Sequence, residues 1–528
     1  MNNHFSHTHQ QGMFRNPLSA FRPDGLFGLR IVLVLLSISW TARATESPRP
    51  NVLFIAIDDL RDWVGFMGGY KARVFTPNLD RLAARGTAFL NAHTASPVCC
   101  PSRAAVMTGL MPSSSGVYNN RHWWRPHRPE LVTIPMHFKR HGYTTVGAGK
   151  IFHHTVGNNP PDQWDDFKRL IFNDDGFSRL TQRYRELYPF TRQQPKPDPF
   201  PLSGIVLYSP EVDWGALTKP EIEFDDAQSA QYGIDFLAQK HAKPFFLACG
   251  IFRPHLPWYI PQKYLDMYPL ESIRLPTVPE DDLDDIPKAG KILALRKAVD
   301  LKKVRDAGQW KTAVRHYLAS ITFADTQVGR LLDALDRSPY KWNTIIVLWS
   351  DHGWHLGEKN HWHKRTLWEA GTRVPFIVSA PGIGQPNQRC QQPVSLLDIY
   401  PTLVELCRLP PVKGLDGVSL TPQLHNPTKS RSRPAVIQSE EQHVAIRNER
   451  YRYIRYRDGS EELYDHQSDP NEWRNRAGDD SLNPVKSELA RWVPTQWAKP
   501  ADSKQAYEFD PLKYRWKHKR TGTIVTGK

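Results

Sequence analysis

The chain has 528 residues, which is long enough to bury a large core and suggests two domains. Its 40% hydrophobic content and 17 tryptophans exclude an intrinsically disordered protein. The formal net charge of +15 is compatible with an anionic substrate or surface. It does not indicate nucleic-acid binding, because basic residues are spread along the chain and no helix-turn-helix, zinc-finger or RNP-like pattern occurs.

The first 44 residues are typical of an export signal. A basic leader ending at Arg30 precedes an apolar run over 31–40, and Ala42-Arg43-Ala44 provides a small-x-small cleavage site. The run is too short to span a bilayer comfortably. We therefore predict a signal peptide over 1–44, export to the periplasm or the medium, and no membrane span in the mature chain. An uncleaved anchor is the alternative.

The mature chain begins with a predicted strand that ends in two acidic residues. The continuous apolar run from Asn51 to Ile57 is typical of a strand buried on both faces, and Asp58-Asp59 follow it directly. Acidic residues at the carboxyl end of a parallel strand lie where α/β sheets place their sites. A turn or helix cap is the simpler interpretation of this pair. The next helix is expected to open at Thr76-Pro77 and to close at Gly86.

The most unusual stretch is Pro97-Val98-Cys99-Cys100-Pro101-Ser102-Arg103. Pro101 suits the first turn of a helix and Gly109 suits its end, so Cys99 is expected at or just before a helix N-terminus. The helix dipole and free N–H groups there favour an anion. An activated nucleophile facing an anionic substrate is one interpretation, and a buried cysteine pair on an ordinary loop is the other.

Several basic side chains follow predicted strands. The strands over 144–146 and 245–250 lead to Lys150 with His153 and to His255, and Lys364 lies in a charged loop. If these side chains converge, they would bind sulfate or phosphate and supply an acid for the leaving group. Taken singly, each is also compatible with an ordinary polar or surface position.

The second half of the chain continues the alternation of strand and helix. Apolar residues at helical spacing predict a long amphipathic helix over 310–335, and a buried strand over 344–349 ends at Asp351-His352. A strand over 374–380 and a helix over 396–408 follow. This alternation predicts an α/β domain over 45–430 with a mostly parallel sheet flanked by helices. Residues 160–220 are expected to form a long insertion that shapes the substrate pocket.

The hydrophobic pattern of the sequence changes after residue 430. Short alternating strands around a hairpin turn at Asp458-Gly459 predict a small antiparallel sheet, packed with one helix over 484–497. The tail after Lys504 is expected to be an irregular basic surface extension. We therefore predict a smaller C-terminal subdomain over 431–528.

Two further groups of residues suggest ligands. The carboxylates of Asp58, Asp59 and Asp351 are hard oxygen donors that suit Ca²⁺ or Mg²⁺ better than zinc, whereas His352 would be a less usual ligand for such an ion. The second group is an aromatic and basic loop, which with Trp354 is predicted to bind a uronic-acid sugar by stacking and by ion pairs. Its residues are Trp123, Trp124, Arg125 and His127. Hydrophobic packing is the alternative for this loop.

The motif around Cys99 decides between several of these alternatives. Cys99-x-Pro101-Ser102-Arg103 followed by Met107-Thr108-Gly109 resembles the signature of type I sulfatases, and the resemblance covers about Arg49 to Gly478. Within that family the Asp351-His352 pair resembles the iduronate-2-sulfatase branch. Other segments that resemble the sulfatase pattern are Asn51-Val52, Asp58 to Arg61, Gly149 to His153, Arg253 to Pro257, Ser350 to Glu358 and Leu463 to Asp465.

The resemblance implies an alkaline-phosphatase-like fold and a defined site. It implies that a maturation enzyme oxidises Cys99 to formylglycine, and that this group holds Ca²⁺ together with Asp58, Asp59, Asp351 and His352. Arg103, Lys150 and His153 would support the formylglycine, and His255 and Lys364 would hold the sulfate. The implied reaction is attack of the formylglycine hydrate on sulfur, with His255 protonating the leaving oxygen. By this resemblance, loss of a proton to His153 would then expel sulfate and restore the aldehyde.

The sequence therefore predicts an exported, calcium-dependent sulfatase that acts on a sulfated saccharide. A choline-sulfatase-like enzyme and a phosphonate or phosphate monoester hydrolase are the enzymatic alternatives. A glycan-binding protein on an inactive scaffold is the alternative from another class. The identity of the sugar and any pairing of Cys390 with Cys407 stay open at this level.

Overall fold

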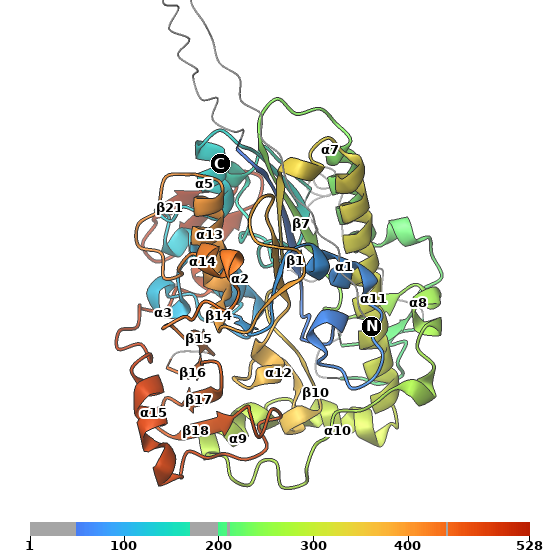
Figure 1. Cartoon of the computed structure of the whole chain (residues 1–528), viewed down its shortest axis with the longest axis vertical. Helices are drawn as coiled ribbons and strands as arrows, with labels where there is room; N and C mark the ends of the chain where they lie inside the picture. The colour runs from blue at the N-terminus through green and yellow to red at the C-terminus, as the bar shows by residue number, and fades with distance from the viewer. Residues whose placement is uncertain (1–48, 169–198, 208–211, 440–441) are drawn as a thin grey trace, which may run out of the picture. The chain divides into compact units, whose positions relative to one another are not determined.

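The computed structural model describes residues 49–168, 199–207, 212–439 and 442–528 (Figure 1). The predicted signal peptide and part of the predicted insertion lie outside these ranges. Residues from Arg49 to Lys528 form one compact unit. Within the described ranges, we find no helix with both the length and the apolar character needed to cross a bilayer.

A mixed sheet of eight strands runs through this unit in the order β13-β2-β12-β9-β1-β7-β4-β5. Its members are β1 (Asn51–Ile57), β2 (Thr87–Phe89), β4 (Thr144–Gly149), β5 (Asp166–Lys168), β7 (Phe245–Ile251), β9 (Thr344–Ser350), β12 (Phe376–Ser379) and β13 (Gln388–Cys390). Strand β1 lies between β7 and β9 and is parallel to both, so that Ile57 is level with Ile251 and Ser350. The segments that follow these three strands therefore leave the sheet at one edge.

The predicted fold class is confirmed, with one difference in strand direction. Strand β12 runs antiparallel to β9 and to β2, although the alternating pattern suggested another parallel strand. Apolar runs report burial on both faces and carry no information on direction. The chain reaches β12 through the loop that carries Lys364 and the four-residue helix α12 (Glu369–Thr372), which is too short to serve as the crossover of a parallel pair, and this allows the strand to run backwards.

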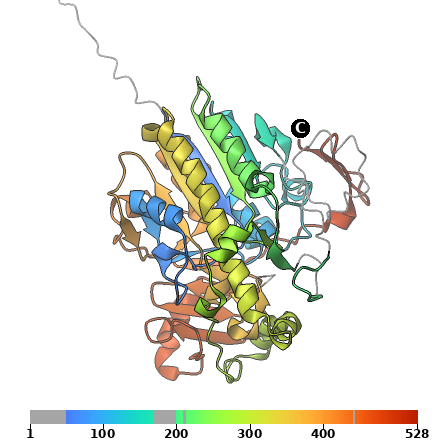
Figure 2. The same ribbon diagram turned by 90° about the vertical axis from the view of Figure 1, so that its right-hand side faces the viewer.

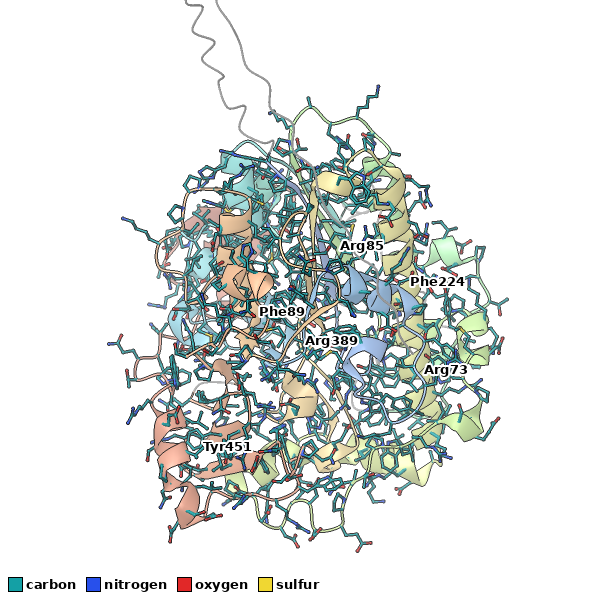
Figure 3. All side chains as sticks on the ribbon, in the orientation of Figure 1. Arg73, Arg85, Phe89, Phe224, Arg389 and Tyr451 are labelled. Carbon is teal, nitrogen blue, oxygen red and sulfur yellow. The ribbon has the colours of Figure 1, made fainter. Side chains whose placement is uncertain are left out.

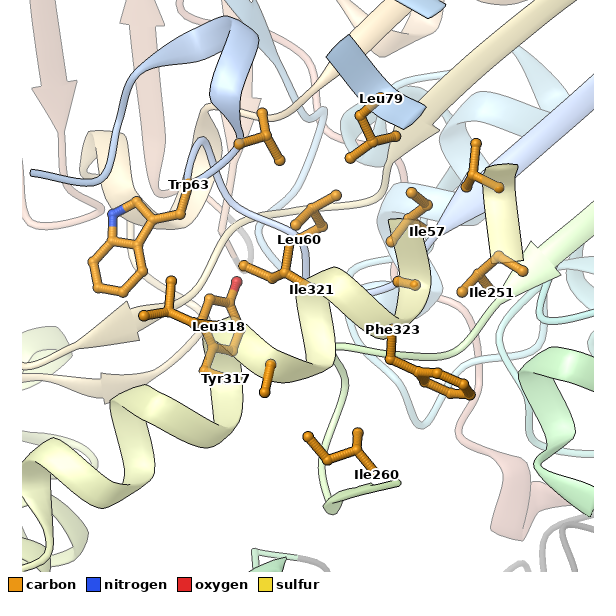
Figure 4. Packing of buried hydrophobic residues seen from close by; sticks show 14 of the residues in the cluster. Ile57, Leu60, Trp63, Leu79, Ile251, Ile260, Tyr317, Leu318, Ile321 and Phe323 are labelled. Atoms are coloured by element: carbon orange, nitrogen blue, oxygen red, sulfur yellow. The ribbon is translucent and has the colours of Figure 1, made fainter. Parts of the chain in front are cut away.

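Helices cover both faces of the sheet because each strand is apolar on both sides. One face packs against α1 (Pro77–Arg85), α7 (Asp225–Leu237) and α11 (Trp310–Arg337), which Figure 2 shows in front of the strands. The other packs against α2 (Cys99–Thr108), α5 (Ile134–Arg140) and α13 (Ile399–Leu406). Alternate residues of β1 enter the two layers, Ile57 with Ile321 of α11 in the first (Figure 4) and Phe54 in the second.

Individual side-chain contacts tie these layers together. Arg85 of α1 pairs with Asp336 of α11 at 2.7 Å, and the ring of Phe89 stacks on Phe376 with centroids 4.8 Å apart (Figure 3). The first contact joins two helices on the surface, and the second joins two neighbouring strands inside the sheet's second layer.

A second sheet of four antiparallel strands lies in the C-terminal part. It contains β15 (Ala435–Gln438), β16 (Val444–Arg447), β17 (Tyr451–Arg455) and β18 (Glu461–Asp465), in chain order. The predicted hairpin turn is present, with Gly459 at φ 85°. The accompanying helix α15 (Asn483–Ala490) is shorter than predicted and buries Leu489 against the sheet.

The expectation of an irregular tail was wrong. Residues 507–526 form a three-stranded antiparallel sheet of β19 (Tyr507–Asp510), β20 (Arg515–His518) and β21 (Ile524–Thr526). Its Tyr514 and Trp516 are buried and pack against Trp123, almost 400 residues earlier. Sequence reasoning missed this sheet because its strands are short and its apolar contacts come from a distant segment.

Candidate active site

Three carboxylates meet where β1 and β9 end. The backbone N–H of Asp58 donates to Ile251 O at 3.1 Å, and that of Asp351 donates to Ile57 O at 3.3 Å. The Asp59 N–H donates to Asp351 Oδ1 at 3.1 Å. The ladder that aligns the three central strands therefore also fixes these acidic residues, all fully buried, against one another.

Cys99 occupies the first turn of α2, as predicted. Gly109 ends this helix at φ 73°, and a Cβ there would lie 2.5 Å from Leu415. The Cys99 Sγ lies 3.1 Å from Lys364 Nζ, 3.2 Å from His352 Nε2 and 3.8 Å from Lys150 Nζ. A buried nucleophile position thus lies at a positive helix end between two ammonium groups, which suits an anionic substrate.

Arg103, one turn further along α2, ties the carboxylates to the site. Its Nε donates to Asp351 Oδ2 at 2.8 Å, and one terminal nitrogen donates to Asp58 Oδ1 at 3.2 Å. The other terminal nitrogen donates to the backbone carbonyls of Lys150 and Ile151. Four of the five N–H donors of Arg103 are used in these bonds, so its main role is to orient its neighbours.

Lys150 reaches the site from the end of β4. Gly149 has φ 78°, and a Cβ there would lie 2.0 Å from Gly250 O of the neighbouring strand. This close backbone approach needs glycine and directs Lys150 inward. Its Nζ contacts Asp58 Oδ2.

Lys364 follows a hairpin of β10 (His355–Leu356) and β11 (Trp362–His363) and is 4% exposed, so the surface-loop alternative is wrong. Its Nζ lies 2.8 Å from Asp59 Oδ1 and 5.4 Å from the centroid of the Trp354 ring. Burial alone would lower the pKa of Lys364, but the neighbouring Asp59 and Cys99 outweigh burial and hold it above its ordinary value.

The imidazoles are neutral and have distinct orientations. His352 Nδ1 lies 3.1 Å from Gly353 O, so Nε2 presents its lone pair toward Cys99 and Asp59. His255 Nδ1 lies 2.6 Å from Leu256 O, and its Nε2 is 3.8 Å from Asp59 Oδ2. Burial is the main cause that keeps the pKa of His153 and of His255 well below the usual range, followed by neighbouring positive or imidazole groups.

His153 rather than His154 is the buried member of its pair, which the sequence left undecided. Its Nδ1 is enclosed and has no hydrogen-bond partner among the described residues. A neutral imidazole with an unused ring nitrogen can accept a proton.

Asp59 is the least well compensated of the three acids. Its Oδ2 is buried and accepts no hydrogen bond from any described residue. Burial raises the pKa of Asp59 to about 7, although Lys364 acts in the opposite direction. By contrast, the pKa of Asp351 lies well below its usual range, because Arg103 and His352 outweigh burial.

The residues present fit a hard divalent cation. Ligand atoms of Asp58, Asp59, Cys99 and His352 all lie within 4.8 Å of one another, and the orphaned Asp59 oxygen belongs to this set. Asp351 is not a member of this set, and its oxygens accept from Arg103 and from the backbone N–H groups of Asp59 and His352; its role as a ligand stays a prediction.

The predicted sugar-binding loop has a different role from the one expected. Trp123 and Trp124 are 7% and 1% exposed, and their indole N–H groups donate to the carbonyls of Val156 and Asn158. Arg125 pairs with Asp162, and His127 packs beside Gly116. The stacking faces are covered by the C-terminal sheet and by Phe152, so the packing interpretation holds for both tryptophans. Trp354 is also buried, under Lys364 and His363.

Two positioning residues were missed. Ser102 Oγ donates to Asp351 O at 2.6 Å, and Tyr317 Oη of α11 donates to Asp59 O at 2.7 Å. Ser102 lies inside the Cys99 motif, and its place there could have been used to predict a role in the site. Tyr317 is one of many apolar positions on a long helix, and nothing local distinguishes it.

All five cysteines are free thiols, so Cys390 and Cys407 are not paired. Burial, the largest cause, raises the pKa of the Cys99 thiol above its ordinary value. An unmodified thiol at this position would therefore be a poor nucleophile at neutral pH.

Comparison with known proteins identifies the family. The model of the sulfatase family matches residues 50–408, and that of the N-sulphoglucosamine sulphohydrolase C-terminal region matches 357–498. A sulfatase of Formosa agariphila is 37% identical over 92% of this chain and 93% of its own length. The iduronate 2-sulfatase of Homo sapiens is 31% identical over 76% of each chain.

A solved structure shows the same fold. It is that of a protein in complex with its substrate D-glucosamine-2-N,6-O-disulfate, with a TM-score of 0.65 over 84% of this chain and 97% of that chain, at 20% identity. The aligned strand ends, the motif at Cys99 and the family match agree: this chain belongs to the sulfatase family and is a sulfuric ester hydrolase.

Proposed function

We propose that this protein is an exported, calcium-dependent sulfatase that removes sulfate from a saccharide, with Cys99 matured to formylglycine. One observation carries the proposal. The Cys99 side chain lies at a helix N-terminus, within 4 Å of two lysines and a histidine, beside the Asp59 carboxylate, one oxygen of which accepts no hydrogen bond from the described residues. A thiol there has a raised pKa, which favours a different nucleophile at this position.

A saccharide bearing a uronate is the substrate class that we propose. Support comes from the similarity to a human iduronate 2-sulfatase over three quarters of the chain, with Asp351-His352 in place. Formylglycine would act as its hydrate, which has two hydroxyl groups. One hydroxyl would be the nucleophile, and the other would permit release of sulfate. Its formation requires a maturation enzyme.

The chain's own residues divide the remaining work. Lys150 and Lys364 bind the sulfate oxygens, because their ammonium groups lie on either side of Cys99. The Nδ1–H of His255 donates to Leu256 O, so its Nε2 faces the site with a lone pair; His255 therefore protonates the leaving oxygen only as imidazolium, with a proton that Nε2 takes up when the anionic substrate binds. His153, neutral and with a free ring nitrogen, accepts the proton that is lost when sulfate departs. Arg103 and Ser102 keep Asp351 in place throughout.

Calcium would be held by Asp58, Asp59, His352 and the oxygen that replaces the Cys99 sulfur. Bound there, it would supply positive charge that polarises a sulfate oxygen and would satisfy the orphaned Asp59 oxygen. The fit rests on hard carboxylate donors and on the free lone pair of His352 Nε2.

The first test is sulfate release by the full chain coexpressed with a maturation enzyme, with residue 99 verified as aldehyde by peptide mass. The panel contains a 2-sulfated uronate disaccharide, choline sulfate, 4-nitrophenyl sulfate and a phenyl phosphonate monoester. We expect release from the uronate and the aryl ester, and a loss of about 10⁴-fold or more in Cys99→Ala.

The outcomes separate the alternatives. Turnover of choline sulfate without the uronate would establish the choline-type enzyme, and turnover of the phosphonate alone would establish the monoester hydrolase. Activity at the wild-type level in Cys99→Ala would overturn the mechanism. Absence of all turnover with the aldehyde present would favour a binding protein.

A further inference from the structure

The C-terminal tail reaches the neighbourhood of the reaction centre. The two family models end at residues 408 and 498, so β19 to β21 and the segment before them lie outside both. This segment is fastened to the loop that follows the nucleophile helix. The Ala501 N–H donates to Gly116 O and the Lys504 N–H donates to Arg121 O, each at 2.8 Å. The tail sheet then closes over Trp123 with Trp516.

These contacts place the ammonium group of Lys504 beside the loop that carries His153. Lys504 Nζ donates to the hydroxyl of Thr155, two residues after His153, and lies 5.8 Å from the centroid of the Trp123 ring. Lys504 as a whole is half-buried. Because Thr155 and His153 belong to the same short loop, this contact places Lys504 next to the segment that carries His153.

Cations also lie on the Lys364 side of the same site. Arg365 follows Lys364 directly in the chain, and His363 on the other side of Lys364 packs on Trp354. Positive charge therefore borders the reaction centre from two segments distant in sequence, the Lys364 loop and the tail segment of Lys504. Such a border attracts a substrate that carries more negative charge than one sulfate, and it repels a quaternary ammonium.

We propose that Lys504 is a specificity-determining residue that binds a second anionic group of the substrate, a carboxylate or a further sulfate, beyond the sulfate that is removed. The proposal rests on the proposed function. It adds that a segment outside the family models selects polyanionic saccharides. The Thr155 hydroxyl holds the ammonium group in place before the substrate arrives, which reduces the entropy lost on binding.

The test measures binding by calorimetry in the Cys99→Ala background, where no turnover occurs. The probe is a disaccharide of 2-sulfated uronate and 6-sulfated glucosamine. Two further probes lack one anionic group each, the carboxyl-reduced and the 6-desulfated disaccharide. We expect Lys504→Ala to bind the full probe about tenfold more weakly, as for loss of one charge-assisted hydrogen bond, and Lys504→Arg to retain most of the affinity.

The truncated probes identify the group that Lys504 binds. With the probe that lacks that group, Lys504→Ala should cause no further loss, as in a double-mutant cycle. Lys517→Ala is the matched control, because Lys517 lies on β20 of the same tail with a half-exposed side chain near Glu508. Its affinity and melting temperature should equal those of the wild type.

Three results would overturn the proposal: unchanged affinity in Lys504→Ala, an equal loss with all three probes, or no binding of the full probe to the parent protein. Wild-type turnover of 4-nitrophenyl sulfate is measured in parallel. If that turnover fails, the proposed function fails, whereas the affinities still decide the role of Lys504.

Discussion

Among the described residues two clusters, one fully buried and one partly buried, hold the types of side chain that bind metals, yet they differ in which of their atoms lack partners. The reaction centre groups Asp58, Asp59, Cys99 and His352, and a second cluster, which we call the interface cluster, groups Glu369, His466 and Glu472. In both, the candidate ligand atoms lie within 4.8 Å of one another. Proximity of ligand types alone therefore does not distinguish a metal site from a structural network.

The interface cluster is already complete. Glu369 contacts Arg452 and lies 3.3 Å from Arg447, and Glu472 lies 2.5 Å from Arg452 and 2.9 Å from His466. Burial alone would raise the pKa of both glutamates, but these cations outweigh it and lower both. The cluster joins α12 (Glu369–Thr372) to the second sheet and leaves no oxygen in need of a cation.

The reaction centre has the opposite balance. The pKa of Asp59 rises to about 7 and one of its oxygens has no described partner. Buried charge that is not compensated costs stability, and proteins retain it where a ligand or ion completes the set. The comparison teaches that orphaned oxygens, more than ligand proximity, mark the functional cluster.

The largest effect is expected from Asp59→Asn. Loss of this carboxylate should remove bound calcium, as measured by metal analysis after dialysis, and lower kcat at least about a hundredfold. Glu369→Gln is the matched control, since it also deletes a buried carboxylate from a ligand-like cluster but should keep calcium stoichiometry unchanged. Equal calcium loss in both variants would contradict the distinction between the clusters.

A large effect on stability is expected from Glu369→Gln. Arg447 and Arg452 would lose a buried partner, which typically costs about 3 to 5 kcal/mol. Asp59→Asn in metal-free protein at pH 7 should not destabilise and should stabilise slightly, because the carboxylate it removes is poorly compensated. Urea unfolding of both variants in EDTA measures the difference. A larger loss in Asp59→Asn would reverse our interpretation.

A smaller effect is expected in the pH dependence of stability. Glu369 and Glu472 have lowered pKa values, so the stability they contribute is present above their unfolded pKa near 4.5 and is lost as pH falls below it. Glu369→Gln should therefore make the stability of the protein depend less on pH below about 4.5. Asp59 acts with the opposite sign, since its raised pKa makes metal-free protein lose stability as pH rises from about 4 to 7.

Melting temperatures between pH 3 and 7, with EDTA and with calcium, check both slopes. Asp59→Asn should raise the metal-free value at pH 7 by a few degrees, and calcium should abolish that advantage. A variant that follows the wild-type curve at every pH would show that Asp59 is compensated in solution.

Much of the reaction centre was predictable because its signals are local. The run before Asp58, the proline and glycine that bound the Cys99 helix, and the positions of Lys150 and His255 after strands each depend on a few neighbouring residues. The convergence of these ends followed from strand alternation, since parallel strands finish at one edge.

Other features could not be predicted. Trp123 and Trp124 have the composition of a sugar platform, but their faces are covered by Trp516 and Phe152. The direction of β12, the tail sheet and the proximity of Lys504 to the His153 loop likewise depend on partners far along the chain. No property of the local residues encodes such a partner.

The sequence by itself determined the central strands and the helix of Cys99, and which side chains follow the strand ends that face the site. The tertiary structure alone decided which of these side chains are compensated. It gave Glu369 two arginines and left an oxygen of Asp59 without a described partner. The reason is physical: propensity and capping act over a few residues, whereas burial and charge compensation depend on every group that folding brings within a few ångströms.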